Sequence, residues 1–391
     1  MSVQTARLGD IADDLRSGFA CGVDDPDGVI QFRMNNVERD GTLNWTKTRR
    51  VPQSMVKDGL TLQSDDILLN ATNSPDLVGK TALFVGAVEP ITFSNHFLRL
   101  RTKTNAADPA YVARWLRRQF ELGNFKAMCR SWVNQASITR DQVSNLEIPL
   151  PPLDEQKRIA AILDKADQLR QKRRQAIALL DSLTQSIFLE MFGDPVSNPK
   201  GWPQSKVGDI CRVVTGNTPS RETAAYYDGA DVEWIKSDNI VAGNTFLSKA
   251  AECLSSKGKA VARVAPPNST LVTCIAGSPN SIGNVGLADR EVAFNQQINA
   301  VIPVRLEPWF QFFHLKYAKK LVQAQSTGGM KGLVSKSRLE SVLLMDPPME
   351  LQQDFTKSAR LHSSVAERLI TDKNIDALFS SLQHRAFSGQ L

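Results

Sequence analysis

Polar side chains that could form hydrogen bonds with nucleic-acid bases gather in short loops between apolar segments of the sequence. Asn and Gln can donate to and accept from adenine at the same time, while Arg and Lys can reach guanine or a phosphate. One polar loop is weak evidence, because most loops are polar, but similar loops recur in both halves of the chain. The candidate DNA-contacting residues are Arg33, Asn35, Asn36, Asn70, Thr72, Asn73, Asn95 and His96 in the first half and Lys236, Ser237, Asn239, Asn295, Gln296, Gln297 and Lys331 in the second.

Residues for catalysis or metal binding do not form a recognisable set. Gly79-Lys80-Thr81 ends like a phosphate-binding loop, but that motif needs a glycine at the position occupied by Ser74. The four histidines lack the spacing of metal ligands, and no glycine-rich loop for a cofactor is present. We therefore expect a chain without catalytic residues, metal or cofactor.

One tetrad has a second interpretation. Asp346-Pro347-Pro348-Met349 resembles the tetrad that holds the target amine in amino-methyltransferases, but Met349 stands where an aromatic residue would stack on the base. The tetrad also aligns with residues 150–153, where prolines stop a strand before a helix. We favour this structural interpretation.

A long helix is predicted to support the loops. Asp154, Glu155 and Gln156 suit its first turn, and Gly193 and Pro195 are stop signals. At 1.5 Å per residue, a helix of about 38 residues is about 57 Å long. Its apolar residues repeat with a period near 3.5, which predicts a partner helix. They are Ile159, Ile162, Leu163, Ala166, Leu169, Ala176, Ile177, Leu180, Leu183, Ile187 and Met191.

A basic cluster interrupts this apolar stripe. It consists of Arg170, Lys172, Arg173 and Arg174. We interpret it as a solvated helix face, with a phosphate contact as the alternative if nucleic acid crosses the helix.

The partner helix is predicted in the same chain, because the sequence repeats. Residues 345–353 repeat the pattern of residues 150–157 at a spacing of about 196 residues. Residues 206–210 correspond to 7–11, and residues 294–297 correspond to 93–96. Two copies of a globular domain followed by a long helix therefore make up the chain.

Composition allows two domains and sets a few limits. The 391 residues carry a net charge of +6, which permits a polyanionic partner without requiring one. The five cysteines form no close pair, which fits a reducing cytoplasm and not a zinc ribbon. No apolar run is long enough to cross a membrane, so we expect a cytoplasmic protein without membrane contact.

Together these features resemble the specificity subunit of type I restriction–modification enzymes, over the whole chain. The helix-entry string at residues 149–159 is the most specific part of the resemblance. Further matches lie at residues 191–195, 216–221, 234–235, 294–300 and 328–332. The loop at residues 33–36 departs from the family pattern, so individual contacts in the first domain are less well defined than its role.

The resemblance implies an α+β fold with two similar globular target recognition domains, separated by two long helices that pair as an antiparallel coiled coil. We expect the first domain at residues 1–150, the first spacer helix at 151–193, the second domain at 194–346 and the second helix at 347–391. Each domain would read one half of a bipartite target in double-stranded DNA. The helix pair would set the spacing and dock two methyltransferase subunits, and ATP-dependent restriction subunits would join through the complex.

Two other classes of protein remain as alternatives. The first is an enzyme, a DNA adenine methyltransferase that carries its own recognition domain; bound S-adenosylmethionine in the isolated chain would favour it. The second is a coiled-coil scaffold without DNA binding, which failure to bind DNA in the assembled complex would favour.

Overall fold

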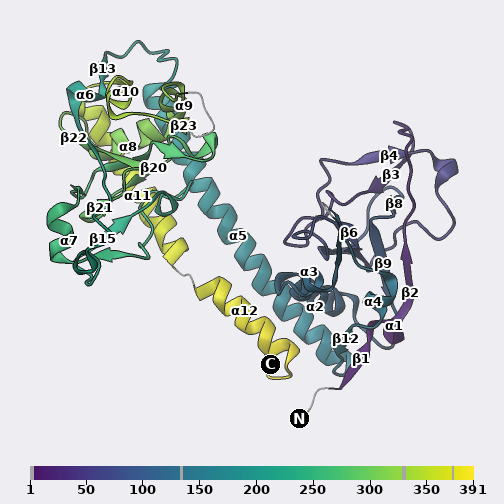
Figure 1. The fold of residues 1–391 in the computed structure, drawn as a ribbon. Coiled ribbons are helices and arrows are strands. Elements are labelled where there is room, and N and C mark those ends of the chain that lie inside the picture. Colours follow the sequence, from purple (N-terminus) through teal and green to yellow (C-terminus); the bar gives the residue numbers. More distant parts are fainter. Residues whose placement is uncertain (1–3, 133–134, 328–331, 372–373) are drawn as a thin grey trace. The chain divides into compact units, whose positions relative to one another are not determined.

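The computed structural model describes residues 4–132, 135–327, 332–371 and 374–391 (Figure 1). It divides into two compact units. Unit 1 comprises Met1–Lys172 and Lys373–Leu391, and unit 2 comprises Arg173–Asp372. A single helix, α5 (Leu153–Phe192), contributes its first half to unit 1 and its second half to unit 2. None of the described helices is long and apolar enough to cross a membrane.

Unit 1 mixes short strands with helices that cover them. Its elements before α5 are β1 (Thr5–Arg7), α1 (Leu8–Ile11), β2 (Ala12–Ser17), β3 (Val29–Phe32), β4 (Arg49–Val51), η1 (Gln53–Met55), β5 (Asp66–Asn70), β6 (Thr72–Asn73), β7 (Thr81–Phe84), β8 (Ile91–Phe93), β9 (Phe97–Thr102), α2 (Pro109–Glu121), α3 (Asn124–Met128), β10 (Arg130–Trp132), β11 (Gln135–Ser137), α4 (Arg140–Ser144) and β12 (Glu147–Pro149). The main sheet has the strand order β2-β9-β5-β7, and β4-β3-β8 and β10-β11-β6 form two smaller sheets.

The core of unit 1 lies between the main sheet and the helices. β5 is buried along its whole length, which its run Ile67, Leu68 and Leu69 explains. Leu69 and Leu100 of the sheet belong to the same apolar cluster as Tyr111 and Leu116 of α2. Asp108 caps α2 by accepting a hydrogen bond from the Tyr111 N–H at 2.9 Å, which fixes where this helix begins.

Unit 2 repeats this plan. After α5 it contains β13 (Gln204–Lys206), α6 (Val207–Ile210), β14 (Cys211–Thr215), η2 (Ala224–Tyr226), β15 (Val232–Ile235), η3 (Ser237–Asn239), β16 (Cys253–Leu254), α7 (Ser256–Val261), β17 (Val264–Ala265), β18 (Thr270–Thr273), β19 (Ile275–Ala276), η4 (Pro279–Ser281), β20 (Val285–Leu287), β21 (Val292–Phe294), β22 (Ile298–Pro303), α8 (Pro308–Tyr317), α9 (Lys319–Ala324), β23 (Gly332–Leu333), α10 (Lys336–Glu340), β24 (Leu343–Met345) and α11 (Met349–Thr371). Its main sheet, β14-β22-β18-β20, has the same connectivity as β2-β9-β5-β7.

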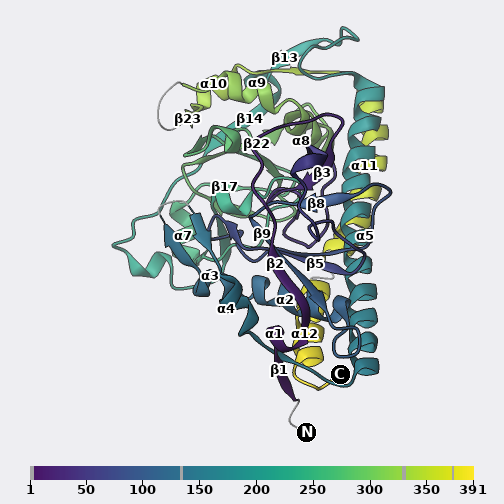
Figure 2. The ribbon, with the colours of Figure 1, turned by 90° about the vertical axis from the view of Figure 1, so that its right-hand side faces the viewer.

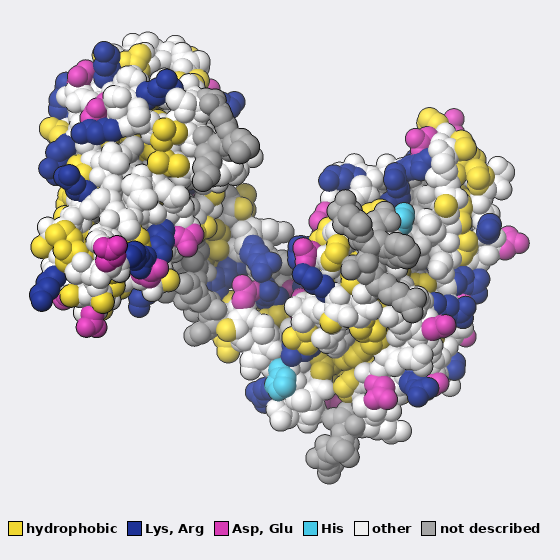
Figure 3. Space-filling model, viewed as in Figure 1, with side chains coloured by type: hydrophobic (Ala, Val, Ile, Leu, Met, Phe, Trp, Pro, Cys, Tyr) yellow, Lys and Arg dark blue, Asp and Glu magenta, His cyan; other side chains and the backbone are white. Residues whose placement is uncertain are grey.

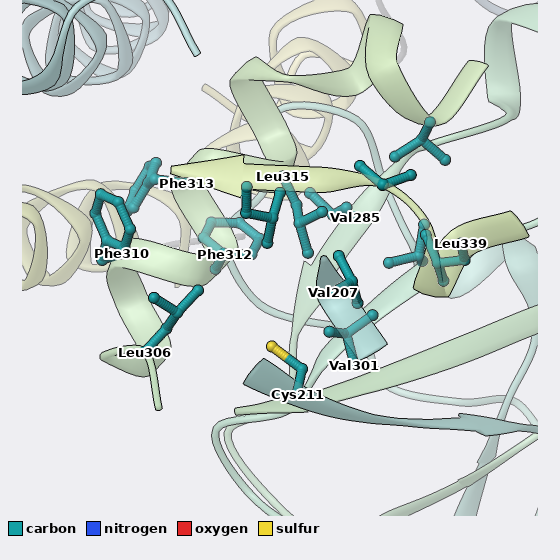
Figure 4. Close-up of a cluster of buried hydrophobic side chains, with 14 of the residues drawn as sticks. Val207, Cys211, Val285, Val301, Leu306, Phe310, Phe312, Phe313, Leu315 and Leu339 are labelled. Carbon is teal, nitrogen blue, oxygen red and sulfur yellow. The ribbon is translucent and has the colours of Figure 1, made fainter. Parts of the chain in front are cut away.

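Aromatic side chains fill the core of unit 2. Figure 4 shows Phe310, Phe312 and Phe313 of α8 packed in the same cluster as Val207 of α6 and Val301 of β22. Burying one such side chain contributes about 1.5–3 kcal/mol, so this cluster is a main source of the unit's stability.

A buried histidine joins this core to the last strand. His314 of α8 is fully buried, and its Nε2 accepts a hydrogen bond from the Met345 N–H at 3.0 Å. Burial lowers the pKa of His314 to about 3, so the ring is neutral at physiological pH. The histidine acts as part of the core.

In each unit a two-strand pair holds the ends of the globular part together. β1 pairs antiparallel with β12, placing Thr5 opposite Pro149, and β13 pairs antiparallel with β24, placing Gln204 opposite Met345. We call these pairs the clasps. Each clasp precedes a helix that begins after the prolines, so the helix-entry interpretation of the Asp346 tetrad is confirmed.

Helix pairing is antiparallel within each unit. In unit 2, Phe188 and Phe192 of α5 pack against Phe355 of α11, and Thr184 Oγ1 lies 3.0 Å from His362 Nδ1. Figures 1 and 2 both show α11 beside the second half of α5. The second predicted helix is described as two helices, α11 and α12 (Asn374–Phe387), and the chain between them lies outside the described residues.

In unit 1, α12 packs against the first half of α5. The guanidinium of Arg170 bonds Asp376 at 2.7 Å and lies 4.2 Å from the ring centroid of Phe379. With its side chain only 14% exposed, Arg170 contradicts the predicted solvated face. The reason is that α5 turns this residue toward α12.

The predicted apolar stripe of α5 is wrong at two positions. Leu169 is 58% exposed and Leu183 is 46% exposed, whereas the polar residues Asp167 and Thr184 are buried. Because α5 packs against its partner helix and a globular domain at once, its buried face does not follow a simple 3.5-residue repeat.

Candidate nucleic-acid interface

In unit 1 a parallel strand pair brings two predicted loops together. Phe32 of β3 lies opposite Phe93 of β8, so both strands end at the same edge. The N–H of Ser94 donates to the carbonyl of Phe32 at 2.9 Å. Burial and, to a lesser extent, the positive charge of Arg33 lower the pKa of His96.

A third predicted loop joins the same edge. The N–H groups of Ala71 and Thr72 both donate to the carbonyl of His96, at 2.8 and 3.2 Å. The structure therefore brings together all three polar segments predicted in the first half of the chain. We call residues 33–36, 70–73 and 94–96 the loop edge of unit 1.

Unit 2 builds its edge in the same way. Ile235 of β15 lies opposite Phe294 of β21 in a parallel pair, and the N–H of Asn295 donates to the carbonyl of Ile235 at 3.0 Å. The N–H groups of Cys274 and Ile275 donate to the carbonyl of Gln297 at 2.8 and 3.1 Å. Residues 236–239, 273–276 and 295–297 form the loop edge of unit 2.

These backbone hydrogen bonds correspond between the two edges, which confirms the predicted correspondence of residues 294–297 with 93–96. Gln297 occupies the position of His96, and Lys236 occupies the position of Arg33. The side chains at these matched positions differ. The same backbone frame therefore presents two different chemical surfaces.

Several predicted asparagines use their amides inside the protein. Asn36 Oδ1 accepts from the Arg33 N–H at 2.8 Å, and Asn239 Oδ1 accepts from the Lys236 N–H at 2.9 Å. Both side chains are buried and close their loops in the same way. Their amides are therefore committed to shaping the loop edges.

Asn70, Asn73 and Asn295 are also buried at the loop edges. Asn73 Nδ2 donates to Asn70 Oδ1 at 2.9 Å, and Asn295 Oδ1 accepts from the Gln297 N–H at 3.1 Å. Asn70 Nδ2 is buried without a hydrogen-bond partner in the described part of the chain.

The remaining predicted residues reach solvent to different degrees. Arg33, Asn35, Asn95 and Gln296 are exposed, while Thr72, His96, Lys236, Ser237 and Gln297 are partly buried. Ser237 Oγ donates to Gln297 Oε1 at 3.2 Å, and Thr218 Oγ1 donates to Gln296 Oε1 at 2.5 Å. Lys331 lies outside the described residues.

Sequence reasoning missed a buried lysine that supports the edge of unit 1. Lys80 is 5% exposed, and its Nζ donates to the carbonyl of Met34 at 3.0 Å and to that of Val37. Burial lowers the pKa of this ammonium group. Lys80 thus braces the loop that carries Arg33. Because Lys80 follows Gly79, its sequence context resembles the end of a phosphate-binding loop and carries no signal of this bracing role.

Two glycines allow a further segment to reach each edge. A Cβ on Gly18 would lie 2.1 Å from the Phe93 carbonyl oxygen, and one on Gly216 would lie 2.2 Å from the Asn295 carbonyl oxygen. Only glycine permits such a close backbone approach. The segment after Gly216 carries Arg221, which lies in the family-like stretch 216–221 but is not among the predicted contacts.

Charges of both signs lie on the surface of each unit. Figure 3 shows Lys and Arg side chains with Asp and Glu among them on the visible face of each unit. In the described part of the chain, no group of three or more His, Cys, Asp or Glu side chains could hold a metal ion.

Solved structures share this duplicated α+β fold with its long helices. The type I restriction–modification system S subunit from M. genitalium matches with a TM-score of 0.65 at 14% identity, over 98% of this chain and 96% of that chain. A chain from a structure of the assembly and conformational transition of the type I R-M system matches with a TM-score of 0.51 at 19% identity, over 99% of this chain and 98% of that one. The fold is therefore that of S subunits.

The family follows from the sequence itself. The model described as "Type I restriction modification DNA specificity domain" matches residues 32–179 and 199–358, and the chain belongs to this family. The MjaX specificity subunit of Methanocaldococcus jannaschii is 24% identical over 93% of this chain and 87% of its own length. The HindI specificity subunit of Haemophilus influenzae is 25% identical over 49% of this chain and 42% of its own length. The chain is thus a non-catalytic DNA specificity subunit, and the alternative of a methyltransferase is not supported.

Proposed function

We propose that each unit reads one half of a bipartite target in double-stranded DNA through its loop edge. The observation that carries this proposal is the matched backbone of the two edges with unlike side chains, Arg33 and His96 in unit 1 and Lys236 and Gln297 in unit 2. A shared frame holds the loops at equivalent positions, and base-specific hydrogen bonds depend on side-chain type.

Within this proposal the predicted contacts divide into two groups. The exposed or partly exposed side chains are Arg33, Asn35, Thr72, Asn95, His96, Lys236, Ser237, Gln296 and Gln297, and these reach the DNA. The buried amides of Asn36, Asn70, Asn73, Asn239 and Asn295 hold the loops in position. Lys331 stays a predicted contact of unit 2.

Docking of two methyltransferase subunits is proposed for the helices. Large apolar side chains are exposed on α5, α11 and α12, although surface helices normally turn such residues inward. They are Leu169, Leu179, Leu183, Leu189, Leu361, Val365 and Leu378. ATP-dependent restriction subunits would join through that complex, and because host DNA is the substrate, we place the complex in the cytoplasm.

The test is methylation mapping. The chain is expressed with its methyltransferase partners in a host that lacks both, and long-read sequencing then maps the modified adenines. We expect one sequence with two specified parts and a non-specific spacer, and no modification when the chain is omitted. Modification at a continuous site, or at the same site without the chain, would contradict the proposal.

Exchange of one domain tests the independence of the two halves. Residues 202–345 are replaced by the corresponding segment of a relative, so that both junctions fall beside the clasp β13–β24. The hybrid should change one half of the mapped site and keep the other. A hybrid with both halves altered would show that the units do not read separately.

A further inference from the structure

An acidic side chain lies between two basic side chains beside the loop edge of unit 2. Glu252 Oε1 is 2.5 Å from Lys236 Nζ, and Glu252 Oε2 is 2.7 Å from Arg221 Nη2. Both carboxylate oxygens are thus occupied by cations. The hydrogen bond from Lys236, which has the largest effect, and the hydrogen bond from Arg221 both lower the pKa of Glu252. The carboxylate therefore stays charged at neutral pH.

An aromatic platform holds the same two cations. The guanidinium carbon of Arg221 lies 4.2 Å from the ring centroid of Tyr227 and 5.0 Å from that of Trp234. Lys236 Nζ lies 5.0 Å from the same Trp234 ring. Cation–π contacts of this kind restrict long side chains without removing their charge.

Backbone hydrogen bonds tie this cluster to the loops. The N–H of Trp234 donates to the carbonyl of Glu252 at 3.0 Å, and its indole Nε1 donates to the carbonyl of Asn217 at 3.3 Å. Asn217 begins the segment that leads to Arg221, and Lys236 begins the loop that contains Ser237. The two cations therefore come from two loops that meet at one acid.

We propose that Glu252 is a specificity-determining residue of unit 2, which holds Arg221 and Lys236 away from phosphates of non-cognate DNA. This rests on the proposed function of the loop edge. The two cations are released only where the base sequence supplies acceptors that replace both ion pairs. Non-specific binding depends on phosphate contacts, so an acid that occupies two cations weakens it more than it weakens a base-specific complex.

The matched position in unit 1 supports this assignment. Arg33 stands where Lys236 stands, but its exposed guanidinium has no hydrogen-bond or ion-pair partner in the described part of the chain. Within the described residues, unit 1 thus presents an unpaired cation at this position, and unit 2 presents a neutralised one. Among the described residues, the restraint at this matched position is found in unit 2 and not in unit 1.

The experiment measures binding of the assembled methyltransferase complex to two short duplexes over a range of salt. One duplex carries the mapped methylation site, and the other has the same composition in scrambled order. For Glu252→Gln, we expect tighter binding to the scrambled duplex and a salt slope steeper by about 0.9 for each cation released. The ratio of cognate to scrambled affinity should fall.

Two further variants separate this role from a general effect of charge or folding. Glu291→Gln makes the same charge change beside Lys259. Glu291 directly precedes β21, at the opposite end of this strand from the loop edge, so the variant should leave the salt slope unchanged. The double variant Glu252→Gln with Arg221→Gln should bring binding to the scrambled duplex back toward the wild-type value. A merely structural role for Glu252 predicts no such reversal.

The preference of the wild-type complex for its mapped site distinguishes a wrong role for Glu252 from a wrong function for the loop edge. If the wild-type complex prefers its mapped site but Glu252→Gln leaves both slope and affinity ratio unchanged, or weakens all binding equally, the role of Glu252 is overturned. If the wild-type complex shows no preference between the duplexes, the proposed function falls and the inference falls with it.

Discussion

Arg33 and Lys236 illustrate how two residues at matched positions acquire different properties from their neighbours. Arg33 is exposed and unpaired in the described part of the chain, whereas Lys236 is paired with Glu252. A cation that is already neutralised releases few counterions when DNA binds. Position in the fold therefore does not fix the contribution of a residue to binding.

This difference can be measured with single substitutions. Arg33→Ala should weaken binding to every sequence and reduce the salt slope of the assembled complex by about 0.9. Lys236→Ala should reduce the slope less, because Glu252 already occupies the lysine. Equal reductions for the two variants in binding titrations would contradict this account.

At the same scale, the sequence located the polar loops but not the direction of each side chain. Asn36 and Asn239 were predicted contacts because asparagine can read adenine. Asparagine is equally suited to closing a turn on its own backbone, and this use is the one that the structure shows. Residue type alone does not separate the two roles, since both need the same donor and acceptor. Lys80 and Glu252 were missed because their partners are distant in sequence.

Among the secondary-structure elements, α5 depends on a buried ion-pair network in unit 1. Asp167 is 3% exposed and bonds Arg114 at 2.7 Å, Arg117 at 2.8 Å and Arg170 at 3.3 Å. Two of these arginines belong to α2, so the carboxylate fastens the long helix to the globular domain. Burial alone would raise the pKa of Asp167, but the hydrogen bonds from Arg117 and Arg114 outweigh it and lower the pKa.

Asp167→Asn should therefore lower the free energy of unfolding of unit 1 by about 3–5 kcal/mol, because it removes the charge of the buried carboxylate that Arg114, Arg117 and Arg170 share. The neighbour Asp164, whose side chain is 41% exposed and also bonds Arg114, provides the control, and Asp164→Asn should cost less than about 1 kcal/mol. Urea denaturation followed by circular dichroism measures both. Similar losses for the two variants would argue against the network.

The pH dependence of the Asp167 contribution has a definite sign. Since the folded pKa is lowered, the stabilisation is present above the unfolded carboxyl pKa of about 3.9 and is lost as the pH falls through the folded value. The difference between wild type and Asp167→Asn should be constant at pH 5–7, a range above that unfolded pKa, and should narrow below about pH 4. A difference that grew on acidification would contradict the assignment.

The helices also show what an apolar pattern can and cannot predict. Proline and glycine signals placed the first long helix at residues 151–193, close to the described Leu153–Phe192. The prediction of which side of the helix is buried was partly wrong, because Leu169 and Leu183 fit the apolar stripe but are exposed. A leucine that is exposed at the surface looks the same in the sequence as one that faces a core.

For the whole molecule, duplication was the part of the fold that the sequence predicted best. The repeated helix-entry strings and domain frames led directly to two matching units. The parallel pairs β3–β8 and β15–β21 were not predicted, because strands of three or four residues carry little pattern of their own. These pairs create the loop edges, so the arrangement of the candidate contacts needed the structure. The boundaries of the four predicted domains stay predictions.

The length of the helix pair is the proposed determinant of target spacing. Insertion of one heptad after Gln175 and one after Glu367, at the level where Arg173 contacts the Arg368 carbonyl, keeps the antiparallel pairing in register. Each heptad adds about 10 Å at 1.5 Å per residue. That length corresponds to roughly three base pairs at 3.4 Å per pair. Methylation mapping should show unchanged half-sites with a longer spacer and reduced overall activity, because the half-sites also rotate relative to each other.

A heptad in only one helix serves as the control and should destroy the pairing and the soluble protein. A folded, active variant with both heptads that still methylates the original spacing would show that the methyltransferase partners set the distance.

The clasps have a consequence for how such proteins can acquire new targets. Each brings the first and last strands of a globular domain side by side, as with Thr5 opposite Pro149 and Gln204 opposite Met345. A gene segment that replaces everything between the two strands leaves both junctions at one place on the surface of the helix scaffold. The similar strings at residues 150–157 and 345–353 offer natural crossover points for recombination. New specificities can thus arise by reshuffling whole domains in a single genetic event, without passing through intermediates that read neither the old sequence nor the new one.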